Sequence, residues 1–114
     1  MNLLEETLEV LKKYGKEIQD IDWIGSPSFG WFTWEDFMAV ADEEYDNSYG
    51  AQEVASDLVI VFKDGSWLER AEYDGSEWWE YKQLPKKPEK QRKPEKEDIF
   101  SGGVLGWREG GDEE

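Results

Sequence analysis

The chain has 114 residues, and its 28 Asp and Glu residues against 13 Lys and Arg residues give a formal net charge of −15. It contains neither cysteine nor histidine, which excludes disulfides, thiolate chemistry and the side chain most often used for acid–base catalysis and transition-metal binding. No apolar run is long enough to cross a bilayer and no signal-peptide pattern opens the chain, so we expect a soluble, intracellular protein.

A first helix is predicted from residue 3 onward. Asn2 suits the N-cap, and Glu5 stands three residues later, as in a capping box. Leu4, Leu8 and Leu11 recur at helical spacing, and Gly15 is a typical helix stop. The apolar stripe of this helix is expected to pack on one face of a sheet. After it, residues 21–24 and 29–32 are candidates for one or two short strands.

A second helix is predicted over residues 34–45, with Thr33 as its N-cap. On a helical wheel the apolar residues fall on one side, and acidic residues gather on the other: Glu35, Asp36, Asp42, Glu43 and Asp46. The acidic residues near the helix end crowd the negative end of the helix dipole, and the unfavourable charges together cost about 1–3 kcal/mol. Because folding gives no reason for this acidic face, we interpret it as a candidate partner surface.

Residues 58–83 predict a three-stranded antiparallel meander. Residues 58–62 are rich in strand formers, and the two Asp-Gly pairs at 64–65 and 74–75 suit tight turns. The alternation is compatible with Val59, Val61 and Leu68 on one face and Ile60, Phe62 and Trp67 on the other. Since both faces carry apolar residues, we expect helices or short strands to cover both. Turns of two and of three residues are equally compatible, so the register is left open.

These elements define an α+β domain over residues 1–84, in which the three-stranded meander, with one or two further short strands, packs with two helices. Residues 85–98 hold three prolines, six bases and four acids and no apolar residue, which is typical of a flexible linker. Residues 99–114 form a glycine-rich tail in which five apolar residues reappear. A docking segment and a disordered tail are both compatible with it.

The carboxylates admit two chemical interpretations, and neither is supported. Asp42, Glu44, Asp46, Ser48 and Glu53 occupy positions 1, 3, 5, 7 and 12 of a loop like that of an EF-hand. Position 6, however, is not the glycine that the turn needs, and a strand follows where a helix is required. We therefore predict no metal or other cofactor. Many carboxylate pairs could serve acid–base catalysis, but no pattern singles one out, so we assign no catalytic residue and expect no enzyme.

Seven tryptophans exceed what a small core needs. Most of them are expected to fill the core and to cover the sheet. Trp78 and Trp79 are adjacent on one strand and point to opposite faces, so at least one should be partly exposed, and we assign Trp79 to the partner surface. The alternative function is therefore a carbohydrate- or peptide-binding module that uses exposed tryptophans.

The placement of the charge indicates a kind of partner. Residues 1–84 hold 20 acids and 6 bases, a net charge of −14, and no base lies between Lys16 and Lys63, where there are 11 carboxylates. A compact domain of this length is about 30 Å across, and duplex DNA of that length carries about 18 phosphate charges. An acidic surface of this size can occupy the basic groove of a nucleic-acid-binding protein, whereas it repels nucleic acid and anionic membranes.

Three stretches, residues 2–8, 50–53 and 67–82, are similar to small uncharacterised proteins of Gram-positive phages and prophages, and the resemblance covers about residues 2–88. It implies the cytoplasm of a host bacterium, and small acidic phage proteins include inhibitors of CRISPR effectors and restriction enzymes, some of them DNA mimics. It carries over no site residue. We expect a non-enzymatic, phage-type inhibitor that binds a basic nucleic-acid-binding host defence protein through the assigned partner surface, namely Glu35, Asp36, Asp42, Glu43, Asp46 and Trp79.

Overall fold

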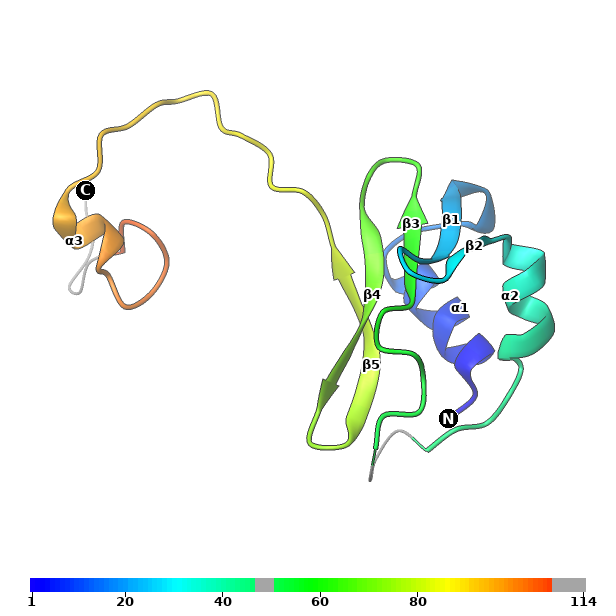
Figure 1. The fold of residues 1–114 in the computed structure, drawn as a ribbon. Helices are drawn as coiled ribbons and strands as arrows, with labels where there is room; N and C mark the ends of the chain where they lie inside the picture. The colour runs from blue at the N-terminus through cyan, green and yellow to red at the C-terminus, as the bar shows by residue number, and fades with distance from the viewer. Residues whose placement is uncertain (47–50, 108–114) are drawn as a thin grey trace. The chain divides into compact units, whose positions relative to one another are not determined.

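The computed structural model describes residues 1–46 and 51–107, and the chain divides into two units, Met1–Leu84 and Pro85–Glu114. The first unit contains two α-helices and a five-stranded antiparallel sheet, so the α+β class is confirmed (Figure 1). The helices are α1, Leu3–Lys13, and α2, Trp34–Ala41, with a 3-10 turn at Ile18–Asp20. The strands are β1, Ile21–Ser26; β2, Gly30–Phe32; β3, Val59–Phe62; β4, Trp67–Tyr73; and β5, Ser76–Lys82.

The sheet has more strands than the three-stranded meander predicted from the sequence. Its order is β2-β1-β3-β4-β5, and every neighbouring pair is antiparallel. Strands β3, β4 and β5 are the predicted meander, and β1 and β2 form a hairpin that extends it at one edge. Helix α2 connects this hairpin to β3, which returns to pair with β1. The described helices include none that is long and apolar enough to span a membrane.

The register between β3 and β4 decides which side chains share a face. Ile60 pairs with Leu68, and Val61 pairs with Trp67. The sequence-based grouping of Leu68 with Val61 is therefore wrong, because directly paired residues point to the same side of a sheet. The β4–β5 hairpin closes through the two residues 74–75, which both have positive φ, as a tight hairpin turn requires. A change of one residue in either loop would have reversed the faces.

Helix α1 begins and ends as the sequence predicts. The side-chain oxygen of Asn2 accepts a hydrogen bond from the backbone N–H of Glu5 at 3.0 Å. Gly15, just beyond the last turn, adopts a φ of +67°, a conformation typical of the residue that stops a helix. Leu11 faces the core, and Thr7, one turn earlier, is also buried. The helix packs against the core as predicted, but Leu8, which the sequence groups with Leu4 and Leu11, is 43% exposed, so the predicted stripe is wrong at this position.

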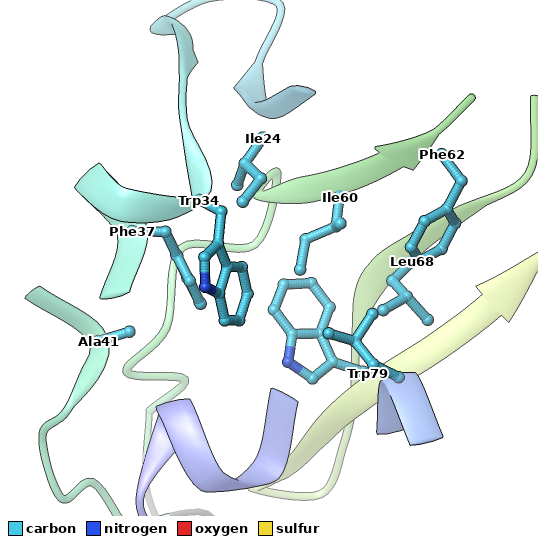
Figure 2. Close-up of a cluster of buried hydrophobic side chains, with 9 residues drawn as sticks. Ile24, Trp34, Phe37, Ala41, Ile60, Phe62, Leu68 and Trp79 are labelled. Carbon is cyan, nitrogen blue, oxygen red and sulfur yellow. The ribbon is translucent and has the colours of Figure 1, made fainter. Parts of the chain in front are cut away.

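The core lies between the two helices and one face of the sheet (Figure 2). From α2, Trp34 and Phe37 pack with their ring centroids 5.5 Å apart. From α1, the hydroxyl of Thr7 accepts a hydrogen bond at 2.8 Å from the indole N–H of Trp79, so this buried indole keeps a polar partner. The buried hydrophobic side chains are Leu11, Ile24, Trp34, Phe37, Ala41, Ile60, Phe62, Leu68 and Trp79.

Both helices lie on the same side of the sheet, so the expectation that both faces are covered is wrong (Figure 1). Along β3, Ile60 and Phe62 are buried, whereas Val59 and Val61 are partly exposed. The two helices contact each other and share a single core, which leaves neither of them for the second face. We call this second face the open face; its side chains include Trp23, Trp31, Val61, Trp67, Glu69, Trp78 and Glu80.

The second unit contains one short helix, α3, Lys96–Ile99, which spans the boundary predicted between linker and tail. Residues 85–95 form neither helix nor strand. After α3, the hydroxyl of Ser101 donates to the carbonyl oxygen of Val104 at 2.9 Å, and the side chains of Phe100 and Leu105 are exposed. Residues 108–114 of the predicted tail lie outside the described residues. A linker with a docking or disordered tail therefore stays a prediction.

We expect Gly25→Ala to destabilise the fold severely. Gly25 has a φ of +149°, and a Cβ at this position would lie 2.0 Å from the carbonyl oxygen of Gly30 in the neighbouring strand. Because backbone atoms cannot yield as a flexible side chain can, the expected loss is about 3 kcal/mol or more of the free energy of unfolding, measured by urea denaturation. Gly15→Ala is the matched control, since φ is also positive but no atom lies within 4 Å. Equal losses in the two variants would contradict the close approach.

Candidate functional site

The first two acidic residues assigned to the partner surface, Glu35 and Asp36, are exposed in the first turn of α2. The Asp36 carboxylate accepts a hydrogen bond from the backbone N–H of Thr33 at 3.3 Å, and the Thr33 hydroxyl accepts one from the N–H of Asp36 at 3.2 Å. The predicted N-cap at Thr33 is therefore confirmed, and Asp36 completes a capping box with it. Glu35 has no partner among the described residues, and its charge suits the positive end of the helix dipole.

The remaining acidic residues lie beyond the helix, because α2 ends at Ala41 and does not reach Tyr45 as predicted. Asp42 is the C-cap residue, and Glu43 and Asp46 follow it in a non-helical segment. Only residues 37–41 of the helix separate Asp36 from Asp42, which corresponds to a distance of about 9 Å along the helix axis. The prediction of one acidic helix face is therefore wrong, and the structure does not bring the five carboxylates together.

Pairing with the N-terminal segment explains where α2 ends. The backbone N–H of Leu3 donates to the carbonyl oxygen of Glu43 at 3.1 Å, and the N–H of Tyr45 donates to that of Met1 at 2.8 Å. A helix continued to Tyr45 would have placed several carboxylates at the negative end of its dipole. The extended path reduces that cost, since only Asp42 stays at the C-cap, and provides backbone hydrogen bonds in exchange.

The carboxylates that follow α2 all stay exposed. We call residues 42–46 the acidic segment; its carboxylates are Asp42, Glu43, Glu44 and Asp46. The Asp42 carboxylate accepts a hydrogen bond from the Asn2 side-chain amide at 2.8 Å, and Glu44 forms an ion pair with the α-amino group of Met1 at 3.2 Å. The Glu43 side chain has no partner among the described residues. The segment thus presents negative charge to solvent, as the sequence predicts, although from a different backbone.

The assignment of Trp79 to the partner surface is wrong. This side chain is 5% exposed, points into the core, and donates its indole N–H to Thr7 at 2.8 Å. Its neighbour Trp78 points to the open face and is 39% exposed. The sequence showed that the two indoles face opposite ways, but the side that the helices cover decides which one is buried.

A buried ion-pair network lies beside Trp79 on the helix-covered face. The side chains of Arg70 and Glu77 are both fully buried, and their nearest nitrogen and oxygen atoms are 3.1 Å apart. Arg70 also forms an ion pair with Glu6 of α1 at 3.2 Å, and its guanidinium carbon lies 4.8 Å from the centroid of the Trp79 ring system. Each ion would be very costly to bury alone, so the network fixes α1 against β4 and β5.

Glu77 extends the network to the chain that leads into β3. Its two carboxylate oxygens accept hydrogen bonds from the backbone N–H groups of Glu53, at 2.7 Å, and Val54, at 3.1 Å. These bonds come in addition to the ion pair with Arg70, so both oxygens of the buried carboxylate have partners. We assign the network a structural role, because its charged groups are committed to one another and to the backbone.

Tyr45 joins the acidic segment to the same network. Its hydroxyl donates a hydrogen bond to Glu6 at 2.5 Å and accepts one from Arg70 at 3.0 Å. Burial, and after it the hydrogen bond to the Glu6 carboxylate, raise the pKa of Tyr45 to about 12, whereas Arg70 opposes the shift. The phenol therefore stays protonated over the physiological range and holds the acidic segment against α1.

The EF-hand-like interpretation gains nothing from the structure. No group of three or more carboxylates in residues 1–46 and 51–107 is arranged to hold a metal ion. Ser48, at position 7 of that loop, lies outside the described residues. Glu53, at position 12, lies in a segment whose backbone N–H is held by Glu77.

The open face is a second candidate site, and the sequence did not reveal it. Trp67 and Glu69 are next to each other on this face of β4, and the indole N–H of Trp67 donates to the Glu69 carboxylate at 2.8 Å. Glu69 pairs directly with Glu80 of β5, so two like charges stand opposite each other. The alternation of side chains along β4 and β5 could have identified the residues of this face, but only once the register between the strands was known.

A shallow hollow adjoins the open face at the β1–β2 edge. Its volume is about 380 Å³, and it is lined by Asp22, Trp23, Ser26, Gly30 and Trp31. Trp31 is 69% exposed. Indole rings and a carboxylate therefore line the same hollow at this edge. The pair Trp67 and Glu69 shows the same combination on β4.

Comparison with models of protein families, with curated proteins and with solved structures found no match to this chain.

We expect Arg70→Leu to cost about 3–5 kcal/mol of the free energy of unfolding, because it leaves the Glu77 carboxylate buried without its cation. Lys82→Leu is the control, since it removes the same charge from an exposed position of β5 and should change stability by less than about 0.5 kcal/mol. Urea denaturation of the two variants measures the difference. Similar losses would show that the buried network is not the constraint we describe.

Tyr45 should make stability fall at high pH. A group whose pKa is raised by folding contributes stability that is complete below its ordinary pKa of 10.0 and is lost as the pH rises toward about 12. Tyr45→Phe should be less stable than the parent by about 1–2 kcal/mol near neutral pH. The gap should narrow between pH 10 and pH 12 in urea titrations, while the exposed Tyr73→Phe control stays close to the parent. A constant gap would contradict the assignment.

Proposed function

We propose that residues 1–84 form a non-enzymatic binding domain that occupies the nucleic-acid site of a basic host defence protein, such as a CRISPR effector or a restriction enzyme. The observation that carries the proposal is the exposure of the acidic charge. Eleven carboxylates and no base lie between Lys16 and Lys63, and ten of these carboxylates are exposed, with only Asp20 half-buried. A surface of one sign attracts a basic partner and steers its approach.

The local contacts support the same proposal. The side chains of Glu35 and Glu43 have no partner among the described residues, and the Asp42 carboxylate is held by a neutral amide and not by a cation. Apart from the α-amino group of Met1, which pairs with Glu44, the cations are placed elsewhere: Arg70 is buried with two carboxylates, and Lys16 is paired with Asp64 at 2.6 Å. The carboxylates of Glu35, Asp42 and Glu43 are thus available to a partner's lysines and arginines, and the resemblance to phage proteins supports host defence proteins as targets.

A second candidate function is binding through exposed tryptophans, as in a carbohydrate- or peptide-binding module. The observation that favours it is the open face, where Trp31 and Trp78 are substantially exposed. Indole faces stack on sugar rings and on planar cations alike. This candidate uses a different side of the sheet from the acidic segment, so the two can be tested separately.

The test measures displacement of fluorescent DNA from purified CRISPR effectors and restriction enzymes by the full chain. We expect displacement by the parent chain, with a potency that falls steeply as salt rises. The variant Glu35→Gln, Asp42→Asn, Glu43→Gln should lose roughly tenfold in potency, because three charges that meet the partner are removed. Its melting temperature should change little, since the loss of the Glu35 charge at the positive end of α2 offsets the relief of like charges at the negative end.

A charge-matched control separates a specific surface from general acidity. Glu9→Gln, Glu72→Gln, Asp74→Asn removes three carboxylates that are also exposed, from positions outside the stretch between Lys16 and Lys63. It should keep potency within about twofold of the parent. If both triple variants displace DNA as well as the parent, or if neither the parent nor the variants displace it from any protein tested, the proposed function is wrong.

A further inference from the structure

The open face combines apolar surface with fixed negative charge. Trp23, Val61 and Trp67 form one row across β1, β3 and β4, because each is paired directly with the next. Adjacent strands are about 4.8 Å apart, so these side chains make a continuous apolar strip. The neighbouring pair Glu69 and Glu80 lies on the same face, one pleat along β4 and β5. Charged and apolar groups are therefore within reach of a single bound polypeptide segment.

The Glu69–Glu80 pair is unfavourable for folding as it stands. Like charges directly opposite on neighbouring strands destabilise a sheet. Neither carboxylate forms an ion pair with any described residue, and Lys82, which stands on the same face opposite Trp67, pairs with neither of them. A cation supplied from outside would relieve the repulsion, so the charge pattern of the face is complementary to a basic ligand.

The geometry favours arginine as that cation. The indole of Trp67 is tied to Glu69 by a hydrogen bond of 2.8 Å, so an aromatic ring and a carboxylate are positioned together before any ligand arrives. A guanidinium group can stack on an indole while it donates two parallel hydrogen bonds to a carboxylate. Lysine offers a point charge without the planar stacking, so it should bind more weakly.

Charge also argues against other occupants of the open face. A second copy of the chain packed face to face would bring two Glu69–Glu80 pairs toward each other, within domains that each carry a net charge of −14. Nucleic acid and anionic membranes present phosphates, which the carboxylates repel. A neutral sugar could stack on the indoles, but it would leave the two carboxylates without a cation.

We infer that the open face docks an arginine-containing segment of a protein partner, with a guanidinium bound at Glu69 and Glu80 beside Trp67 and with apolar side chains of the same segment on the tryptophan strip. The inference rests on the proposed function for the basic character of the partner, and it names a contact surface separate from α2 and the acidic segment. Binding through both surfaces would let one domain engage a basic protein by charge and by apolar contact.

The test uses the full chain and a tryptophan-free, 12-residue peptide in which arginine alternates with leucine. Two companion peptides replace every arginine by lysine or by citrulline, which keeps the shape of arginine without its charge. Binding is measured at constant ionic strength by the change in tryptophan fluorescence and by calorimetry. We expect the arginine peptide to bind more tightly than the lysine peptide and at least tenfold more tightly than the citrulline peptide.

Matched double variants locate the peptide. Glu69→Gln, Glu80→Gln should weaken binding of the arginine peptide at least tenfold, and its fold should be retained because like-charge repulsion is relieved. Glu5→Gln, Glu9→Gln removes the same charge from exposed positions of α1, on the other side of the sheet, and should leave the affinity within about twofold. Trp67→Phe keeps an aromatic ring but loses the hydrogen bond to Glu69, so it should weaken binding severalfold.

Several results would overturn the inference. Equal losses of affinity in the two double variants would show diffuse charge attraction. Equal affinity for the arginine and citrulline peptides would show that the open face does not recognise the positive charge. Absence of binding by the arginine peptide would overturn it as well. So would a panel of glycans that changes tryptophan fluorescence in the parent but not in Trp78→Ala, because sugar would then be the ligand. A dimer in sedimentation that Trp78→Ala dissociates would make the face an interface between copies.

The DNA-displacement assay, run on the same proteins, separates this inference from the proposed function. If the arginine peptide requires Glu69 and Glu80 but no DNA is displaced from any target, the open face binds as inferred and the proposed function is wrong. If DNA is displaced by the parent and by Glu69→Gln, Glu80→Gln alike, and peptide affinity is also unchanged in that variant, the proposed function stands and the inference is wrong.

Discussion

The buried guanidinium of Arg70 is the constraint on which most of this fold depends. A charge with no access to water must be matched by partners at fixed positions. The partners come from four separate parts of the chain: Glu6 on α1, Glu77 on β5, Tyr45 beyond α2, and, through Glu77, the backbone of residues 53–54. The apolar core explains why the helices lie on the sheet, and the network explains where they lie.

The same network shapes the electrostatics of the surface. It withdraws one of the six cations of residues 1–84 into the interior, where its charge is offset by two carboxylates. It also draws Tyr45 toward α1, so the acidic residues before it leave the helix and follow the N-terminal segment. The charge conflict expected at the end of a longer helix is thereby reduced, while Asp42 and Glu43 remain exposed.

The domain therefore has two candidate binding surfaces, which would attract a partner through different interactions. The carboxylates around α2 and the acidic segment act over distances comparable with the Debye length, so they favour fast, salt-sensitive encounters. The open face contributes to binding only when the partner touches it, because stacking on Trp67 and hydrogen bonding to Glu69 require desolvation and a defined orientation of the groups. A basic protein is attracted by the first kind of surface and can be held in one orientation by the second.

The sequence by itself determined the features that depend on near neighbours: the N-cap of α1 at Asn2, the turn at residues 74–75, the α+β class and the excess of negative charge. Short-range rules of capping, turn conformation and alternation suffice for these. Only the tertiary structure decided the end of α2 at Ala41, the burial of Trp79 in place of Trp78, and the grouping of Trp67 with Glu69 and Glu80 on one uncovered face. Each of these depends on strand register or on contacts between distant segments, and local composition does not encode either.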